Sequence, residues 1–285
     1  MNLKILITNN KLDTFGGTEN WCLTMFQALK KLGHTVHIFS NNYGAMAKIM
    51  QKQGAIIQLD SEYDLILANH STTKDVVDNV EGFKIQTVHS KFIDIEQPFS
   101  GVDKHVAVTD EIKDHFELED RIYNPVNTDV FKPTREVRVI NSVLCLSQGK
   151  NAQAEIKKFC KRNNLNLKIN TKWHNPLNQT QLAYAINQAD IVVSVGRGVY
   201  ESIMCDRHII CYDDRGYDNQ ANHYILNQEL FKYQLYHNFT GRFNFPINAT
   251  FDQYLEHFKE NPNVCHNITG FDYLNIANKY LSYVS

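Results

Sequence analysis

The stretch KILITNNKLDTFGGTENWCLTMFQALKKLGHTVHIFS, residues 4–40, predicts a strand, a loop, a helix and a second strand in that order. Its apolar run at 4–8 has the length of a buried strand, and apolar residues recur at helical spacing over 19–32. The run TVHIFS at 35–40 then predicts another strand. A strand, a crossover helix and a strand predict two parallel strands joined by a right-handed connection.

The same alternation continues along the chain and predicts an α/β protein with two Rossmann-like, doubly wound parallel-sheet domains. In the first half we expect further strands at 55–59, 63–69, 84–89 and 105–109, and helices at 45–54 and 109–116. In the second half we expect strands at 142–148, 165–170, 191–195 and 208–213, and helices at 152–164, 179–190 and 200–206. Helical segments and aromatic-rich loops are expected after about residue 219.

The polar stretch at 124–138, which carries two prolines, interrupts the alternation. It predicts a linker between an N-terminal domain over 1–133 and a C-terminal domain over 134–285. A chain of 285 residues is long enough for two such domains.

Composition limits the class of protein. The chain has 29 Lys and Arg against 31 Asp and Glu, which counts against broad affinity for polyanions. It lacks a run of about 20 apolar residues that would span a bilayer, and its start lacks the apolar core of a secretory signal. Its six cysteines and twelve histidines form neither a CxxC pair nor an HExxH motif. We therefore expect a cytoplasmic protein with reduced cysteines, no transmembrane segment and no metal site.

Two glycine-bearing turns between a strand and a helix predict a site for phosphate groups. Gly16 and Gly17 follow the first strand, and Gly196 and Gly198 follow the expected strand at 191–195. Such turns lie at the carboxyl edge of parallel strands and expose backbone N–H groups at a helix N-terminus. The alternative interpretation is that the glycines serve only tight turns.

The second turn adds charged side chains to this pattern. We expect Arg197 to contact a phosphate, and the amides of Gly198 and Val199 to hold phosphate oxygens. Glu201 would accept hydrogen bonds from both ribose hydroxyls, and Tyr200 is a further residue expected to bind the donor. In a purely structural role, Glu201 complements the helix dipole and Arg197 is a solvated side chain. The occurrence of the same kind of turn in both halves favours binding.

Two further residues are candidates for chemistry. Lys150 follows the expected strand at 142–148 and is placed to reach a diphosphate, although a lone lysine here is otherwise simply solvated. His89 ends the strand at 84–89, at the carboxyl edge where catalytic residues collect. A lone histidine is otherwise structural, so both residues carry two interpretations.

Several longer motifs support a family resemblance. They are GGTE at 16–19, TVHS at 87–90, VDKHVAVT at 102–109, NPVNTDVFKP at 124–133, ADIVVS at 189–194, ESIMCDRHII at 201–210 and HNFTGR at 237–242. Together they resemble glycosyltransferase family 4 over most of the chain, and the pair at 102–109 and 124–133 is the most specific. The resemblance implies the GT-B architecture, in which two Rossmann-like domains face an inter-domain cleft.

The resemblance also implies an activity. A sugar would move from a nucleotide-sugar donor of UDP or GDP type to an acceptor hydroxyl, with retention of configuration and without a metal or other cofactor. The N-terminal domain would lie on the acceptor side and the C-terminal domain would bind the donor. The final helix, about 270–285, would pack back on the N-terminal domain.

Site residues follow from the same resemblance, position by position. Glu201 would bind the ribose, the turn at 196–199 the phosphates, and Lys150 the diphosphate. Gly16 and Gly17 would close on the phosphates and the sugar, and His89 would face the reacting centre. Positive groups would stabilise the departing diphosphate, and stabilisation of this kind is usually the largest catalytic contribution.

The chain departs from the family pattern at two positions. The first acid of the E-x7-E motif falls at Val193, which leaves the donor sugar undetermined. The arginine that usually precedes the diphosphate lysine is Gln148, and we expect Arg197 to supply the missing positive charge.

Three functions remain open at this stage. The first is transfer to a cell-surface glycan or a related small or lipid-linked acceptor, by a cytoplasmic protein or one held at the inner membrane face. The second is a phage-type transfer to hydroxymethylated pyrimidines in DNA, in the host cytoplasm. The third is an inactive protein that binds sugar nucleotides. Basic side chains on the first domain would favour DNA, and an apolar patch near Phe92 and Phe99 would favour a lipid-linked acceptor. The oligomeric state is left open.

Overall fold

The computed structural model describes residues 2–171, 176–215, 223–241, 249–262 and 270–284. The chain divides into two compact units, one of Met1–Asn127 with Gly270–Ser285 and one of Thr128–Thr269. We call them unit 1 and unit 2. The division falls between Asn127 and Thr128, within the expected linker and ahead of residue 133, and the last segment of the chain belongs to unit 1.

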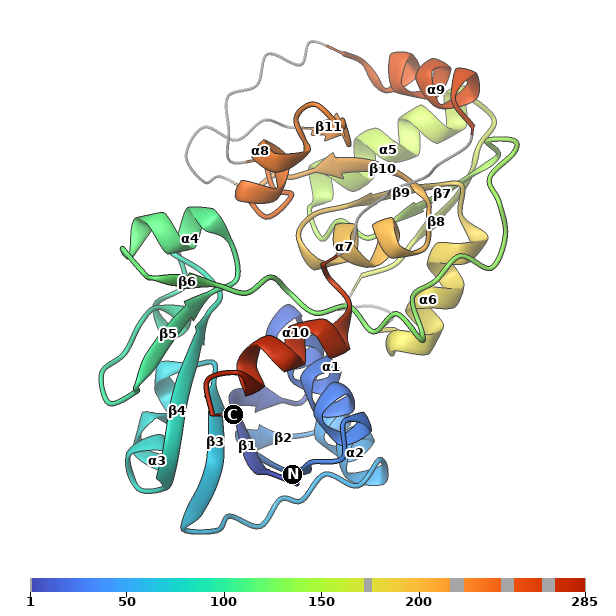
Figure 1. Cartoon of the computed structure of the whole chain (residues 1–285). Coiled ribbons are helices and arrows are strands. Elements are labelled where there is room, and N and C mark those ends of the chain that lie inside the picture. Colours follow the sequence, from blue (N-terminus) through green and yellow to red (C-terminus); the bar gives the residue numbers. More distant parts are fainter. Residues whose placement is uncertain (1, 172–175, 216–222, 242–248, 263–269, 285) are drawn as a thin grey trace. The chain divides into compact units, whose positions relative to one another are not determined.

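Six parallel strands form the sheet of unit 1, in the order β2-β1-β3-β4-β5-β6 (Figure 1). They are β1 Lys4–Leu12, β2 Thr35–Tyr43, β3 Glu62–Ala68, β4 Glu81–Val88, β5 Lys104–Ala107 and β6 Asp120–Arg121. Successive side chains of β1 point to opposite faces, so that Ile5 and Ile7 join one core and Leu6 joins another. The sheet is therefore covered on both faces, as the doubly wound prediction requires.

The prediction of a strand at 55–59 is wrong. Only Ile56 pairs with an edge strand, through a single bridge to His37 on β2. Ile56 and Leu59 are 39% and 37% exposed. A strand at this edge would bury too little apolar surface to be stabilised, because apolar burial is the main favourable contribution.

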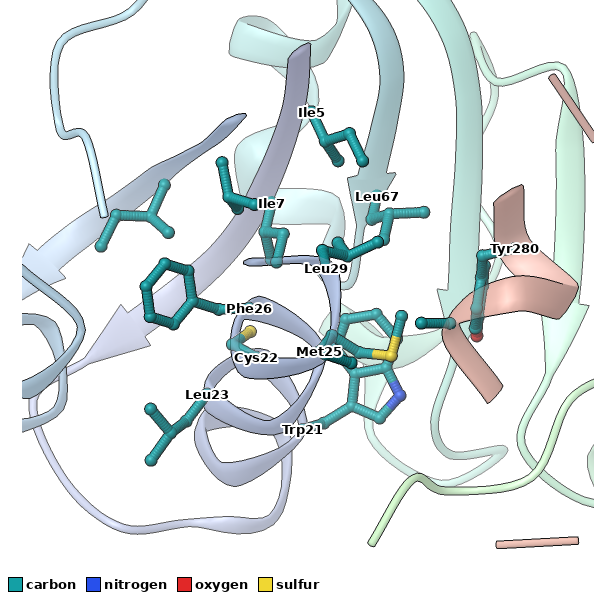
Figure 2. Packing of buried hydrophobic residues seen from close by; sticks show 14 of the residues in the cluster. Ile5, Ile7, Trp21, Cys22, Leu23, Met25, Phe26, Leu29, Leu67 and Tyr280 are labelled. Carbon is teal, nitrogen blue, oxygen red and sulfur yellow. The ribbon is translucent and has the colours of Figure 1, made fainter. Parts of the chain in front are cut away.

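Helices α1 Gly17–Lys31 and α2 Ala45–Lys52 lie on one face of β1 and β2 (Figure 1). The apolar face of α1 points into the core toward Ile5, Ile7 and Leu67 (Figure 2). The other helices of unit 1 are η1 Ser71–Thr73, α3 Lys74–Asp78, η2 Asp94–Glu96, α4 Asp110–His115 and α10 Tyr273–Leu281. Val77 of α3 belongs to the core on the opposite face of the sheet.

The C-terminal helix α10 completes the core of unit 1. Tyr280 is fully buried, and its ring lies edge-on to Trp21 of α1 at 5.8 Å (Figure 2). Its hydroxyl forms a 3.0 Å hydrogen bond with the Thr87 hydroxyl on β4. Asp272 caps the helix by accepting hydrogen bonds from the Leu274 and Asn275 amides.

Unit 2 contains a five-stranded sheet in the order β11-β10-β9-β7-β8. The strands are β7 Ser142–Cys145, β8 Asn166–Ile169, β9 Ile191–Ser194, β10 His208–Tyr212 and β11 His223–Ile225. All pairs are parallel except β10 with β11. The helices are α5 Lys150–Arg162, α6 Gln179–Gln188, α7 Arg197–Met204, α8 Phe231–Tyr236 and α9 Phe251–Glu260. The predicted α/β class with two parallel sheets is confirmed, with one antiparallel strand added at an edge.

Buried polar contacts fix the segment that enters unit 2. Arg135 donates to the Asp190 carboxylate at 2.6 Å and to the Asn187 carbonyl at 2.9 Å. Arg207 is fully buried and donates to the carbonyls of Cys205 and Arg135. These charged hydrogen bonds hold the segment against the C-terminal end of α6.

Among the helices that the structure describes, none has the length and apolar character that a membrane span needs.

Candidate functional site

The carboxyl ends of β7 and β9 carry two of the features predicted to contact phosphate groups, Lys150 and the turn at 196–199. The strands are neighbours that end at Cys145 and Ser194, and beyond them the Leu146 amide donates to the Val193 carbonyl at 2.8 Å. In the order β8-β7-β9-β10, the chain leaves β7 and β9 in opposite directions. This reversal is the topological switch point, where doubly wound sheets bind ligands. Six of the predicted residues from 196 to 201, together with Lys150, follow these two strands.

Gly196 forms the turn that starts α7. Its φ of 54° lies in the left-handed region, which favours glycine. Its amide donates to the Phe239 carbonyl at 3.2 Å, and the Val199 amide donates to the Gly196 carbonyl at 2.9 Å. A methyl group on Gly198 would lie 2.2 Å from the Ser194 hydroxyl, so this position also requires glycine. Because the Val199 amide is engaged within the turn, a phosphate would rely mainly on the Gly198 amide.

The helix begins at Arg197, earlier than the expected residue 200, and this places Arg197 and Glu201 one turn apart. The Arg197 Nε donates to the Glu201 Oε1 at 2.9 Å. Burial raises the pKa of the Glu201 carboxyl, and the Arg197 guanidinium opposes that rise. Tyr200 is fully buried, with its ring edge-on to Phe239 at 4.9 Å. Tyr200 therefore stabilises the turn by packing against Phe239, while Arg197 and Glu201 are the charged side chains at the turn.

The segment that contacts Gly196 has an unusual backbone. Asn238 and Phe239 both have positive φ, 57° and 50°. For a bulky residue this conformation is strained, and strain of this kind clusters at functional sites. Among the described residues, the buried Asn238 Oδ1 has no hydrogen-bond partner. A methyl group on Gly196 would lie 3.8 Å from the Asn238 Nδ2, so Asn238 belongs to the same site. Arg242 of the HNFTGR motif lies outside the described residues.

Lys150 begins α5 and is exposed to solvent. A carboxylate that follows β10 lies at this helix start: Ala152 donates its amide to the Asp214 Oδ2 at 3.2 Å. A methyl group on Gly149 would lie 1.7 Å from the Asp214 Oδ1, so only glycine allows this approach. The Asp214 carboxylate therefore lies at the N-terminus of α5, where the helix dipole favours an anion.

In unit 1, His89 directly follows β4 and is positioned by two side chains. Its Nε2 lies 2.8 Å from the Asn69 Oδ1, and its ring is edge-on to Trp21 at 5.6 Å. The Asn69 Nδ2 donates to the Thr8 carbonyl and to the Cys22 sulfur, so the Asn69 Oδ1 accepts. His89 therefore carries its proton on Nε2 when neutral, and Nδ1 is the basic nitrogen.

Gly16 and Gly17 lie at the start of α1, and the carboxylate of Glu19 folds back over them. A methyl group on Gly16 would lie 2.2 Å from the Glu19 Oε2. Burial raises the pKa of Glu19. The space beside Gly17 is open. A phosphate at this turn would have to displace the Glu19 carboxylate, because like charges repel. The predicted role of Gly16 and Gly17 stays a prediction.

Sequence patterns did not single out His70, which follows β3 at the same edge. It is 4% exposed, and its Nδ1 accepts the Asn10 amide at 3.0 Å. The signal that could have found it is the one used for His89, a histidine directly after an apolar strand. Asn69 and Asp214 also follow strands but carry no such motif.

Two solved structures share this architecture across almost the whole chain. A glycosyltransferase from Rickettsia africae ESF-5 matches with a TM-score of 0.57 and 14% identity, over 99% of this chain and 98% of its own. AviGT4, a glycosyltransferase involved in avilamycin A biosynthesis, matches with a TM-score of 0.50 and 11% identity, over 99% and 97%. The fold is GT-B. No protein family model matches the chain, and no curated protein sequence does.

Among the described residues, no group of three or more His, Cys, Asp or Glu side chains is arranged to hold a metal ion.

Of the two residues considered for an apolar patch, Phe92 is partly exposed and Phe99 is buried. Phe99 is only 8% exposed and packs in the core with Tyr63 and Val80. The Lys91 ammonium lies 5.0 Å from the centre of the Phe92 ring. Phe99 is therefore not available to such a patch, whereas the neighbouring Ile93 is 43% exposed.

Proposed function

We propose that the chain is a glycosyltransferase of the family 4 type. It would transfer a sugar from a UDP- or GDP-linked donor to an acceptor hydroxyl, with retention and without a metal. One observation carries the proposal: the switch point of unit 2 combines a glycine turn with the buried Arg197–Glu201 pair. The GT-B fold agrees with this assignment but does not decide it, since one fold hosts many functions.

The donor would bind at the switch point of unit 2. The Gly196–Gly198 turn offers a backbone amide to a phosphate, and the Glu201 carboxylate is an acceptor for ribose hydroxyls. Transfer breaks the bond between the anomeric carbon and a phosphate oxygen, so negative charge grows on the diphosphate. Lys150 and Arg197 would stabilise that charge. His89 would act at the sugar.

A glycan is favoured over DNA as the acceptor. Unit 1, the proposed acceptor side, has 18 acidic residues against 13 Lys and Arg. Phosphate contacts made by basic residues dominate affinity for DNA, so an acidic unit is poorly suited to it. Retention of configuration and a glycan acceptor are further parts of the proposal.

A panel of UDP-, GDP-, ADP- and CMP-linked sugars tests the proposal. A ligand that binds the folded state raises the melting temperature, and we expect a UDP- or GDP-linked sugar to do so. Slow hydrolysis of the same compound would separate an enzyme from an inactive binding protein. The matched variants are Glu201→Gln in the site and Glu260→Gln at an exposed position of α9. If no nucleotide sugar raises the melting temperature of the parent protein or of the Glu260→Gln control, the proposal is wrong.

A further inference from the structure

His70 has a buried ring nitrogen that points at a carboxylate without reaching it. The Asn10 amide donates to Nδ1, so the neutral ring carries its proton on Nε2. Nε2 lies 3.8 Å from the Glu96 Oε1, which is too long for a hydrogen bond. Among the described residues this Nε2 has no hydrogen-bond partner. A buried N–H group without a partner is costly, and it indicates a missing ligand.

Asn10 and His70 lie at a position in the sheet where doubly wound proteins bind ligands. Asn10 lies on β1 and His70 follows β3, the neighbouring strand. In the order β2-β1-β3, this is the switch point of unit 1. Glu19 is close enough for His70 to influence its pKa. The surroundings are therefore acidic, yet these side chains are not arranged to hold a metal ion.

The chemistry of the gap selects one type of group. A hydroxyl can accept from the His70 Nε2–H and donate to the Glu96 carboxylate at the same time. An ionised phosphate cannot donate to Glu96, and it would also face the negative charges of Glu96 and Glu19. An ammonium group could donate to Glu96 but could not accept from Nε2–H. Of these three groups, only a hydroxyl satisfies both partners.

We propose that His70 and Glu96 form an acceptor subsite for a neutral, polyhydroxylated sugar, and that this subsite rejects phosphate-bearing acceptors. The inference rests on the proposed function, because it places the acceptor in unit 1. A site built to pair with a hydroxyl discriminates strongly against ligands that lack one, since its polar groups would be left unpaired.

The test uses the full chain labelled with ¹⁵N-histidine. The ring signals of His70 are assigned by their loss in His70→Gln. Methyl glucoside and methyl N-acetylglucosaminide are titrated and compared with glucose 6-phosphate and a hydroxymethylcytosine-bearing DNA strand. We expect the two neutral glycosides to shift the His70 signals. Glu96→Gln should weaken their binding about 10- to 100-fold, the loss expected for one hydrogen bond to a charged group.

Glu62→Gln is the matched control, because Glu62 is exposed and lies at the opposite end of β3. It should bind the glycosides as the parent protein does. The inference is overturned if the glycosides leave the His70 signals unchanged, if Glu96→Gln binds them equally well, or if a phosphate-bearing probe binds more tightly. Nucleotide-sugar binding is measured on the same samples. If the parent protein binds no nucleotide sugar, the proposed function is wrong. If it binds a nucleotide sugar but no glycoside, only the proposed subsite is wrong.

Discussion

The Arg197 Nε donates to the Glu201 Oε1 at 2.9 Å across one turn of α7, and both side chains are almost completely buried. Each charge is compensated by the other, because the buried pair is largely shielded from water. Breaking a buried pair by removing one partner is strongly destabilising, since the other charge is left uncompensated. The residues proposed to bind the donor therefore also stabilise unit 2.

Glu201→Ala should reduce both stability and nucleotide affinity. We expect the free energy of unfolding to fall by about 3–5 kcal/mol, as for a broken buried pair. Nucleotide affinity should fall by about 1.5–3 kcal/mol for the lost charged hydrogen bond. Chemical denaturation and calorimetric titration measure the two quantities separately.

Glu201→Gln separates the structural effect from the binding effect, because it keeps the shape and one acceptor oxygen. The control is Glu256→Gln, which changes an exposed ion pair with Lys259 and should alter neither quantity. A folded Glu201→Gln protein that binds the nucleotide as well as the parent protein would contradict the ribose assignment.

His89→Gln should lower turnover with little effect on donor affinity. General acid–base or polar catalysis by a positioned histidine contributes typically about 10²–10⁴-fold, so kcat should fall within that range. Asn69→Ala should give a smaller loss of kcat, because Asn69 acts by orienting the ring of His89. Steady-state kinetics with a donor-binding measurement provides the test.

His105→Gln is the control for this series, since His105 lies on another strand, β5, and bonds to the Phe99 carbonyl. It should leave kcat unchanged. If His89→Gln lowers only donor affinity, its role is in binding and the catalytic assignment is wrong.

Local sequence signals predicted the elements well. The apolar runs and glycine turns indicate strands, helix starts and the strand-end position of His89 without knowledge of any contact. The same signals failed at 55–59, where the run makes a single bridge to the edge strand and leaves Ile56 and Leu59 exposed.

The neighbours of each site residue could not be predicted, because they depend on strand order. Asp214 reaches the start of α5 from 62 residues away, and Asn10 meets His70 across 60 residues. These contacts exist only once β7 lies beside β9 and β1 beside β3. A single sequence does not contain that information, so it indicated the two glycine turns but neither the approach of Asp214 to α5 nor the contact between Asn10 and His70.

Tyr280→Phe should destabilise unit 1 by about 1 kcal/mol, because it removes only the hydrogen bond with Thr87. Tyr280→Ala should cost about 3–5 kcal/mol, since it also leaves a cavity beside Trp21. Denaturation monitored by tryptophan fluorescence is well suited, as Trp21 contacts the changed side chain. Tyr184→Phe, at a 66% exposed position, should stay within about 0.5 kcal/mol of the parent protein. Equal effects of the two Tyr280 variants would show that α10 does not complete the core.

Asp190 should make unit 2 sensitive to acid. Burial alone would raise the pKa of this carboxyl, but hydrogen bonds from the Asn141 and Ser142 amides, the Ser142 hydroxyl and Arg135 lower it overall. A carboxyl whose pKa is lower in the folded state stabilises the protein above its unfolded pKa, near 4. That contribution is lost as the pH falls through the folded pKa. The free energy of unfolding should therefore decline below about pH 4.

Asp190→Asn tests this assignment, because the amide cannot carry the charge that Arg135 and the two amides stabilise. The variant should be less stable than the parent protein at pH 7, and the difference should shrink as the pH is lowered below about 4. Glu260→Gln, at an exposed position of the same unit, should follow the parent protein throughout. Urea denaturation at a series of pH values measures the difference directly. A gap between Asp190→Asn and the parent protein that stays constant down to the lowest pH would mean that shape, rather than charge, makes Asp190 important to the fold.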